Sequence, residues 1–196
     1  MGSERRTRLS PEQRRAQLVA LGVAFLADRP LDDLTIEELS DRAQVSRALI
    51  FHYFGSRQGL HQAVVARAGD ALLEATHPRD ELAAVERLRD TLRRIALFVR
   101  ENRGTFFSLV RGVASGDPEV RVVVDRARDA NAQRLREVFA ELGVPASPLL
   151  DVALRSWVAF AEEVLIELAV DDDVDIDDIV GFLERSVQGV VSAVTL

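Results

Sequence analysis

Apolar residues recur at helical spacing through almost the whole chain, and this periodicity restricts the fold to helices. Residues such as Leu18, Leu21 and Phe25 repeat three and four positions apart, whereas no stretch alternates apolar and polar residues as a β-strand does. Ser10-Pro11-Glu12-Gln13 and Thr35-Ile36-Glu37-Glu38 have the pattern of a capping box, which starts a helix. The sequence therefore predicts an all-α fold.

Helix-start and helix-stop signals divide the chain into expected elements. Proline, glycine and capping residues mark their ends. The expected helices cover residues 10–27, 35–43, 46–55, a segment from Ser56 onward, 80–101, 105–114, 118–143, 149–170 and 176–194. Six aspartates lie in residues 171–178, and we interpret them as a solvated turn; the alternative is a divalent-cation loop, although their spacing does not match a calcium loop.

The composition excludes several classes of protein. The chain has 196 residues, no cysteine and three histidines, so neither a disulfide nor a metal site is expected, and no cofactor is implied. No apolar run approaches the ~20 residues that span a bilayer, so we expect no membrane association and a cytoplasmic location. No nucleophile–base arrangement, paired carboxylates or phosphate loop is recognisable, so we do not expect an enzyme.

The charge is distributed unevenly along the chain. The net charge is -7, but residues 1–67 carry ten arginines against eight acids, whereas residues 68–196 carry 15 arginines against 24 acids. This asymmetry indicates that the first region faces an anionic partner, although the whole chain is acidic.

Two of the expected short helices are separated by only Gln44 and Val45. Two short helices joined by a tight turn form a helix-turn-helix. The spacing places Ser46, Ile50 and Phe54 on the inward face of the second helix, so that its arginine, histidine and remaining aromatics point outward. Such a surface suits the major groove of double-stranded DNA.

Residues 34–60 resemble the TetR family of bacterial transcriptional regulators. The resemblance depends on Ala43-x-Val45-Ser46, Ile50-Phe51-His52-Tyr53-Phe54 and Gly55-Ser56-Arg57-x-x-Leu60. It implies a homodimer in which each subunit has a three-helix DNA-binding head (residues 1–55, with an arginine-rich arm at 1–9) and, joined by a connecting helix, a ligand-binding and dimerisation body (residues 56–196). The operator would be palindromic, because two heads read successive major grooves.

The resemblance also implies which residues contact DNA. They are Thr35, Ser46, Arg47, Ala48, Leu49, Phe51, His52, Tyr53 and Arg57. Gln44, Leu49 and Phe51 depart from the family pattern, which usually has glycine, a hydroxyl residue and tyrosine there. For Phe51 and Tyr53 the alternative is packing against the first helix. For His52 the alternative is a surface position without a contact to DNA. The arm at Arg5, Arg6 and Arg8 would reach a phosphate or the minor groove, or else remain a solvated tail.

The last two expected helices each carry an apolar stripe. One contains Leu154, Trp157, Phe160, Val164 and Leu168, and the other contains Ile179, Leu183, Val187, Val190 and Val194. In the family such helices pack against the partner subunit as a four-helix bundle, so we expect these stripes to form the dimer interface. The alternative is that they form the core of a single subunit.

An apolar stretch near residue 106 marks a candidate wall of a ligand pocket. The candidate ligand-binding residues are Phe98, Phe106, Phe107, Val110, Arg111, Trp157, Phe160 and Glu163. We expect an apolar or aromatic small-molecule effector, anchored by Arg111 or by Glu162 or Glu163; a filled core is the alternative. We therefore predict a repressor that its ligand releases from DNA. Alternatives are a transcriptional activator of the same family and a helical protein-interaction module.

Overall fold

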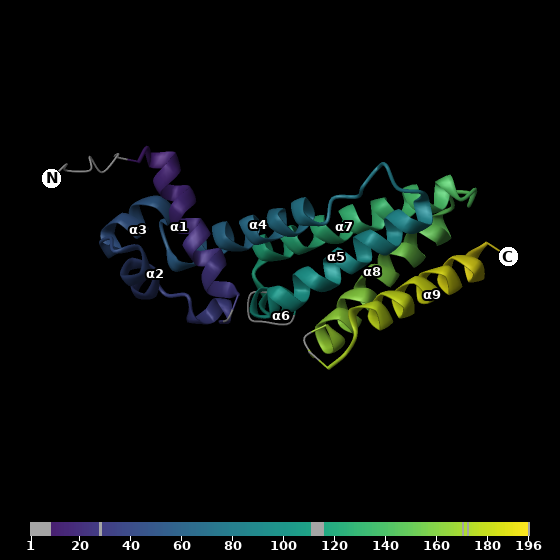
Figure 1. Cartoon of the computed structure of the whole chain (residues 1–196). Helices are drawn as coiled ribbons and strands as arrows, with labels where there is room; N and C mark the ends of the chain where they lie inside the picture. Colours follow the sequence, from purple (N-terminus) through teal and green to yellow (C-terminus); the bar gives the residue numbers. More distant parts are fainter. Residues whose placement is uncertain (1–8, 28, 111–115, 170, 172, 196) are drawn as a thin grey trace.

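The computed structural model describes residues 9–27, 29–110, 116–169, 171 and 173–195, and these residues form helices without a strand (Figure 1). The elements, in chain order, are α1 (Pro11–Leu26), η1 (Leu31–Asp33), α2 (Ile36–Ala43), α3 (Arg47–Phe54), α4 (Arg57–Ala75), α5 (Ala84–Glu101), α6 (Arg103–Val110), α7 (Pro118–Glu141), α8 (Pro148–Leu168) and α9 (Ile176–Val194). The predicted all-α fold is confirmed.

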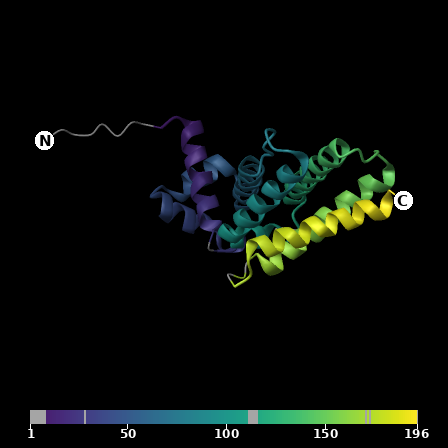
Figure 2. The ribbon, with the colours of Figure 1, turned by 45° about the vertical axis from the view of Figure 1, so that its right-hand side comes forward.

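The molecule is elongated, with a small head at one end and a larger helical body at the other (Figures 1 and 2). Helices α1, α2 and α3 form the head, and α4 leads from the head into the body. The C-terminal end of α9 lies far from α3, at the opposite end of the molecule.

Capping side chains begin the head helices where the sequence predicts. Ser10 and Gln13 form a reciprocal capping box at the start of α1, and the side chain of Thr35 accepts from the backbone N–H of Glu38 at 3.0 Å. Ser46 caps α3 and Ser56 caps α4 in the same way. Each cap satisfies a backbone donor that a helix start leaves unpaired, which fixes where these short helices begin.

Two hydrophobic clusters hold the chain together. The head cluster consists of Leu18, Val19, Phe25, Leu26, Leu31, Leu34, Ile36, Leu39, Ile50, Phe54, Leu60, Val64, Val65 and Val120. The body cluster consists of the buried apolar residues of α5, α8 and α9 and those of α7 other than Val120, together with Leu72, Phe106 and Ala169. The head cluster therefore includes residues of α4 and α7, which lie beyond the expected domain boundary at residue 55.

Two close contacts fasten the head to the body. Val120, in the first turn of α7, is 1% exposed and belongs to the head cluster. At Gly104, in the first turn of α6, a side chain would meet the backbone oxygen of Leu26 at 2.7 Å, so α6 approaches the end of α1 as closely as the two backbones allow. The two parts therefore meet through rigid, closely packed helix ends.

Predicted helix starts agree with the structure within two residues, with one exception. The fifth helix begins at Ala84 instead of residue 80, because residues 80–82 form a turn and a bend. The sixth begins at Arg103, two residues earlier than predicted, since Asn102 ends α5 and α6 follows at once.

Five of the ten residues of the expected dimer stripes belong to the subunit's own core, so the interpretation as an interface is wrong for these five. Leu154, Trp157, Ile179, Leu183 and Val187 are all buried within one chain. Phe160 and Leu168 are exposed, in contrast, at 41% and 39%. Helices α8 and α9 pack against α7 and α5, and this contact uses the face that the sequence assigned to the partner.

None of the helices in the described residues combines the length and the hydrophobicity that crossing a membrane requires. Within the same residues, no three His, Cys, Asp or Glu side chains are grouped so that they could hold a metal ion.

Candidate nucleic-acid interface and internal cavity

The turn between α2 and α3 is tightly fixed. Gln44 has φ 52° and ψ 46°, the left-handed conformation that lets the chain reverse direction after α2. The hydroxyl of Ser40 donates to the carbonyl oxygen of Val45 at 2.6 Å across this turn. A non-glycine residue in this conformation costs about 1–2 kcal/mol, which the hydrogen bond and the packed helices on both sides offset.

Helix α3 has one face in the head cluster and the other in solvent. Ile50 and Phe54 are buried, and Ser46 is exposed at the helix start instead of facing inward as predicted. On the outer face Arg47, Ala48 and His52 are exposed, and Phe51 is 50% exposed. This exposure favours a contact role for Phe51 over packing against α1.

Tyr53 and Leu49 have intermediate positions. Tyr53 is half-buried, packs against the head cluster and touches His52 edge-on, with ring centroids 5.3 Å apart. The alternative of packing therefore applies to part of the Tyr53 ring, while the remainder stays accessible. Leu49 is also half-buried and donates its backbone N–H to the Ser46 hydroxyl.

Two of the predicted contact residues already have partners. A guanidinium nitrogen of Arg47 lies 2.9 Å from a carboxylate oxygen of Glu37 in the first turn of α2, and both side chains are more than half exposed. Arg57, in the first turn of α4, donates to the backbone oxygen of Asp32. Both arginines remain near the surface, so a phosphate can compete for them.

His61 is a structural residue that the sequence analysis did not select. Its Nε2 lies 2.8 Å from the carbonyl oxygen of Leu34, which ties α4 to the segment before α2. Burial lowers the pKa of His61 below the ordinary value for histidine. No local signal marks it, because its partner lies in another part of the sequence.

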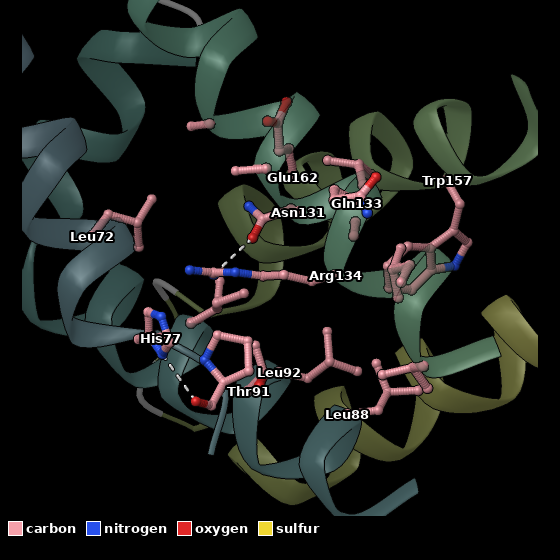
Figure 3. Close-up of a pocket in the computed structure, with 18 of the residues that line it drawn as sticks. Leu72, His77, Leu88, Thr91, Leu92, Asn131, Gln133, Arg134, Trp157 and Glu162 are labelled. Carbon is pink, nitrogen blue, oxygen red and sulfur yellow. Dashed lines mark hydrogen bonds between the residues drawn. The ribbon is translucent and has the colours of Figure 1, made fainter. Parts of the chain in front are cut away.

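The body encloses a cavity of about 410 Å³ between α4, α5, α6, α7 and α8 (Figure 3). This volume lies within the range of small-molecule sites. Much of its wall is apolar and includes Leu72, Leu88, Leu92, Ile95, Phe106, Val110, Leu135, Val138, Trp157 and Leu165. Its polar lining residues include His77, Arg87, Thr91, Asn131, Gln133, Arg134 and Glu162.

The structure brings only some of the predicted ligand residues to this cavity. Phe106, Val110 and Trp157 line it. Phe98, Phe107, Phe160 and Glu163 are not among its lining residues, and Phe107 and Phe160 are exposed at 53% and 41%, because they lie on the outer faces of α6 and α8. Arg111 lies outside the described residues, as do arm residues Arg5, Arg6 and Arg8.

The polar wall is the part that sequence reasoning missed. Most of its members lie on α5 and α7, whose polar positions look like an ordinary solvated face in the sequence. Glu162, named as one alternative anchor, does line the cavity, but both its oxygens accept from Arg128. Oε2 lies 2.9 Å from Nε and 2.7 Å from Nη2, and Oε1 lies 3.1 Å from Nε. The indole N–H of Trp157 is also occupied, since it donates to the Ser186 hydroxyl at 2.8 Å.

A helix-turn-helix head with an outward polar and aromatic face, joined to a helical body that encloses a cavity, defines a class of DNA-binding regulators. Comparison with family models agrees with this class. Residues 18–64 match the model described as bacterial regulatory proteins of the tetR family, and residues 84–188 match the tetracyclin repressor-like C-terminal domain. The chain therefore belongs to the TetR family of transcriptional regulators, whose members bind DNA as dimers.

Individual relatives support the same conclusion. The chain is 26% identical to the HTH-type transcriptional activator FasR of Mycolicibacterium smegmatis over 131 residues, which are 66% of this chain and 60% of that protein. A tetR-family regulator from Streptomyces coelicolor has a similar structure, with a TM-score of 0.83 and 26% identity over 95% of this chain and 83% of that one. AibR, solved in complex with isovaleryl coenzyme A and operator DNA, shares the fold at a TM-score of 0.64 and 17% identity, over 88% of this chain and 97% of its own.

Proposed function

We propose that this regulator is a ligand-released repressor that binds a palindromic operator as a homodimer. The observation that carries the DNA contact is the outer face of α3, where Arg47, Phe51 and His52 are exposed while Ile50 and Phe54 hold the helix in the head cluster. A short helix enters the major groove productively only when the rest of the head supports it in this way.

Each of the other candidate residues has a role in this contact. Thr35 caps α2 and Ser46 caps α3. The backbone N–H groups at the N-terminal ends of these two helices face DNA phosphates. Ala48, Leu49 and Tyr53 supply apolar and hydroxyl contacts beside Arg47 and His52. Arg57 contacts the DNA backbone at the edge of the site. There its guanidinium gives up the Asp32 carbonyl oxygen and binds a phosphate instead.

The dimer is supported by an exposed apolar face on the last two helices. Phe160 of α8 and Phe182 of α9 lie against each other, with ring centroids 6.0 Å apart, and are 41% and 43% exposed. Val152, on the same helix as Phe160, is 51% exposed. Exposed large apolar side chains grouped on neighbouring helices mark an interaction surface, and a two-fold axis would bury them against the same face of a second copy.

The cavity supports regulation by a small molecule. Its apolar wall, formed by residues such as Leu92, Phe106 and Trp157, takes the apolar part of an effector. Because α4 and α7 both line the cavity and both contribute to the head cluster, a ligand that binds more tightly to a spread arrangement of the heads reduces operator affinity.

An activator is the second candidate function, and the name of the FasR relative favours it. The same head and the same cavity serve both functions. The difference lies in where the operator stands relative to a promoter and in whether the effector lowers or raises occupancy.

Selection of bound DNA from a random pool by the purified protein tests the proposal. We expect two inverted half-sites, centred about one helical turn or a multiple of it apart. A variant with Arg47→Ala and His52→Ala should lose selected-site affinity, whereas Val122→Ala, on the exposed surface of α7, should not. Recovery of no enriched sequence, or of a single unrepeated half-site, would contradict the proposal. Transcription in vitro from a promoter with the selected site then separates repressor from activator.

A further inference from the structure

One arginine of the cavity forms no ion pair with a carboxylate of the described residues. Of these residues, two arginines line the cavity, Arg87 and Arg134. Arg87 forms an ion pair with Glu141. Arg134, in contrast, forms no ion pair within the part of the chain that the structure describes, and its hydrogen-bond partners there are all neutral; Figure 3 shows one of them, Asn131.

The partners of Arg134 lie on one side of the cavity. Nη1 donates to the Thr76 hydroxyl and to the Asn131 side-chain oxygen, each at 3.1 Å, and Nη2 donates to the Leu73 carbonyl at 3.1 Å. Arg134 lines the cavity, and Figure 3 shows its guanidinium directed toward the side of Leu72 and away from Trp157. It is half-buried, and burial lowers its pKa below the ordinary value for arginine.

A cation in this position is costly unless something offsets the lost hydration. Leu73 and Thr76 belong to the last turn of α4, so the negative end of that helix supplies about half a charge. The charge of nearby Arg94 opposes that of Arg134, whereas the exposed Glu137 carboxylate favours it. Arg94 has its own carboxylate partner in Asp90 at 2.7 Å. The end of α4 offsets only part of the positive charge on Arg134, and the guanidinium lies in a cavity whose wall is largely apolar. An anionic ligand binds strongly to a cation in such a setting.

We propose that Arg134 is the anion-binding group of the effector cavity, and that the effector is an apolar molecule with one carboxylate. This inference rests on the proposed ligand-controlled function and names the chemical class of its effector. The carboxylate pairs with the guanidinium, and the apolar part extends along the wall formed by Leu92, Phe106 and Trp157.

The position of Arg134 also links the effector to the connecting helix. The same guanidinium fastens the end of α4 to α7 through Leu73 and Thr76. A carboxylate competes for these N–H groups, because a charged acceptor forms stronger hydrogen bonds than a neutral one. Binding of the anion thus loosens the attachment of α4, the helix that leads into the DNA-binding head.

The acidic residues of the cavity do not favour a cationic ligand. The Glu162 carboxylate accepts hydrogen bonds from Nε and Nη2 of Arg128, and Glu141 forms an ion pair with Arg87. Asp80 and Glu137 are exposed, and the Glu137 carboxylate accepts from Gln133 at 2.9 Å. Because water screens the charges of Asp80 and Glu137, they affect the electrostatic potential inside the cavity less than the half-buried Arg134 does.

Calorimetric titration of the full chain, without DNA, tests the proposal. The probes are the straight-chain acids from hexanoate to tetradecanoate and the aromatic acids benzoate and naphthoate, each compared with the alcohol and the amine of the same skeleton. We expect at least one acid to bind about tenfold to a hundredfold more tightly than its alcohol, and Arg134→Gln to abolish this preference.

Two further variants separate binding from folding. Arg134→Lys keeps the charge and should retain part of the preference for the acid, whereas Arg126→Gln, an exposed change of equal charge on α7, should retain all of it. The coenzyme A thioester of the best acid has no carboxylate at that position, so its binding should not depend on Arg134. If no acid is preferred over its alcohol, or if the preference survives Arg134→Gln, the proposal is overturned; tighter binding of the amines would overturn it as well.

Operator binding in the presence of the best acid is measured separately. Preferred binding of the acid with unchanged operator affinity would refute the proposed ligand-controlled function and leave the assignment of Arg134 standing. Release of DNA by neutral compounds alone would support the ligand-controlled function and refute the assignment of Arg134.

Discussion

The side-chain amide of Gln58 donates to a carboxylate oxygen of Asp117 at 2.9 Å. This contact joins the first turn of α4 to the N-cap of α7, where the Asp117 side chain also accepts from the backbone N–H of Glu119 at 2.9 Å. One carboxylate therefore holds the start of the connecting helix beside the start of a body helix, close to the head. The hydrogen bond from Gln58 is the largest cause that lowers the pKa of Asp117.

The lowered pKa predicts how the stability of this junction depends on pH. Because the folded-state pKa lies below the ordinary value of 3.8, the carboxylate contributes stability above that value and loses it as the pH falls through the folded-state pKa. Asp117→Asn should lower the melting temperature at neutral pH, and the difference from wild type should shrink as the pH falls below 3.8. Asp129→Asn, an exposed change on α7, should give no such convergence. A constant difference across this range would refute the role of the carboxylate.

The ion pair between Arg47 and Glu37 predicts a gain in DNA affinity when the acid is removed. Glu37→Gln frees the Arg47 guanidinium from a partner that competes with DNA. An exposed pair contributes up to about 1 kcal/mol, so operator affinity should rise about two- to fivefold, and less at high salt. Fluorescence anisotropy with labelled operator measures this change. Asp41→Asn makes the same charge change on α2, and an equal gain there would show that the specific pair is irrelevant.

The left-handed residue between α2 and α3 predicts a stabilising substitution. Gln44→Gly removes the steric cost of φ 52° but adds conformational freedom to the unfolded chain. We expect a net gain of about 0.5–1 kcal/mol in the free energy of unfolding, measured by urea denaturation. Gln17→Gly, at an exposed position within α1, should have the opposite sign. Destabilisation by Gln44→Gly would show that the Gln side chain contributes more than its backbone strain costs.

The proposed dimer face predicts the effect of a charge at Phe160. Phe160→Glu places two like charges, one from each subunit, against an apolar surface. It also removes the ring that lies against Phe182. The dimer dissociation constant should rise at least about tenfold, as measured by light scattering after gel filtration. Val122→Glu changes a 63% exposed apolar residue on α7 and should leave the mass unchanged. An unaltered dimer in Phe160→Glu would place the interface elsewhere.

Local signals were sufficient to predict the head. Capping by Ser10, Thr35, Ser46 and Ser56 depends on residues three positions apart, so the sequence contains the whole interaction. The burial of Ile50 and Phe54 follows from helical spacing in the same way. These elements position the candidate DNA contacts, and the sequence therefore indicated that face of the molecule.

The body was less predictable because its helices are apolar on more than one side. On α8, Trp157 faces the core and Phe160 faces solvent, although both look like members of one stripe in the sequence. Periodicity cannot distinguish a core face from an interface when both are hydrophobic. The role of Arg134 was equally hidden, since it depends on which distant residues bond its guanidinium and on its forming no ion pair among the described residues.

Val120 extends from the start of α7 into the packing of α1 and α4, so neither half of the chain completes its interior alone. A fragment that stops at the end of α4 would leave an unfilled hole at this point and expose the neighbouring leucine and valine side chains to water. Heating should consequently melt the intact protein in one calorimetric peak, whereas two resolved peaks would mean that the halves unfold independently. Strain that a bound molecule introduces in the body would then reach the DNA-reading end without crossing a flexible joint.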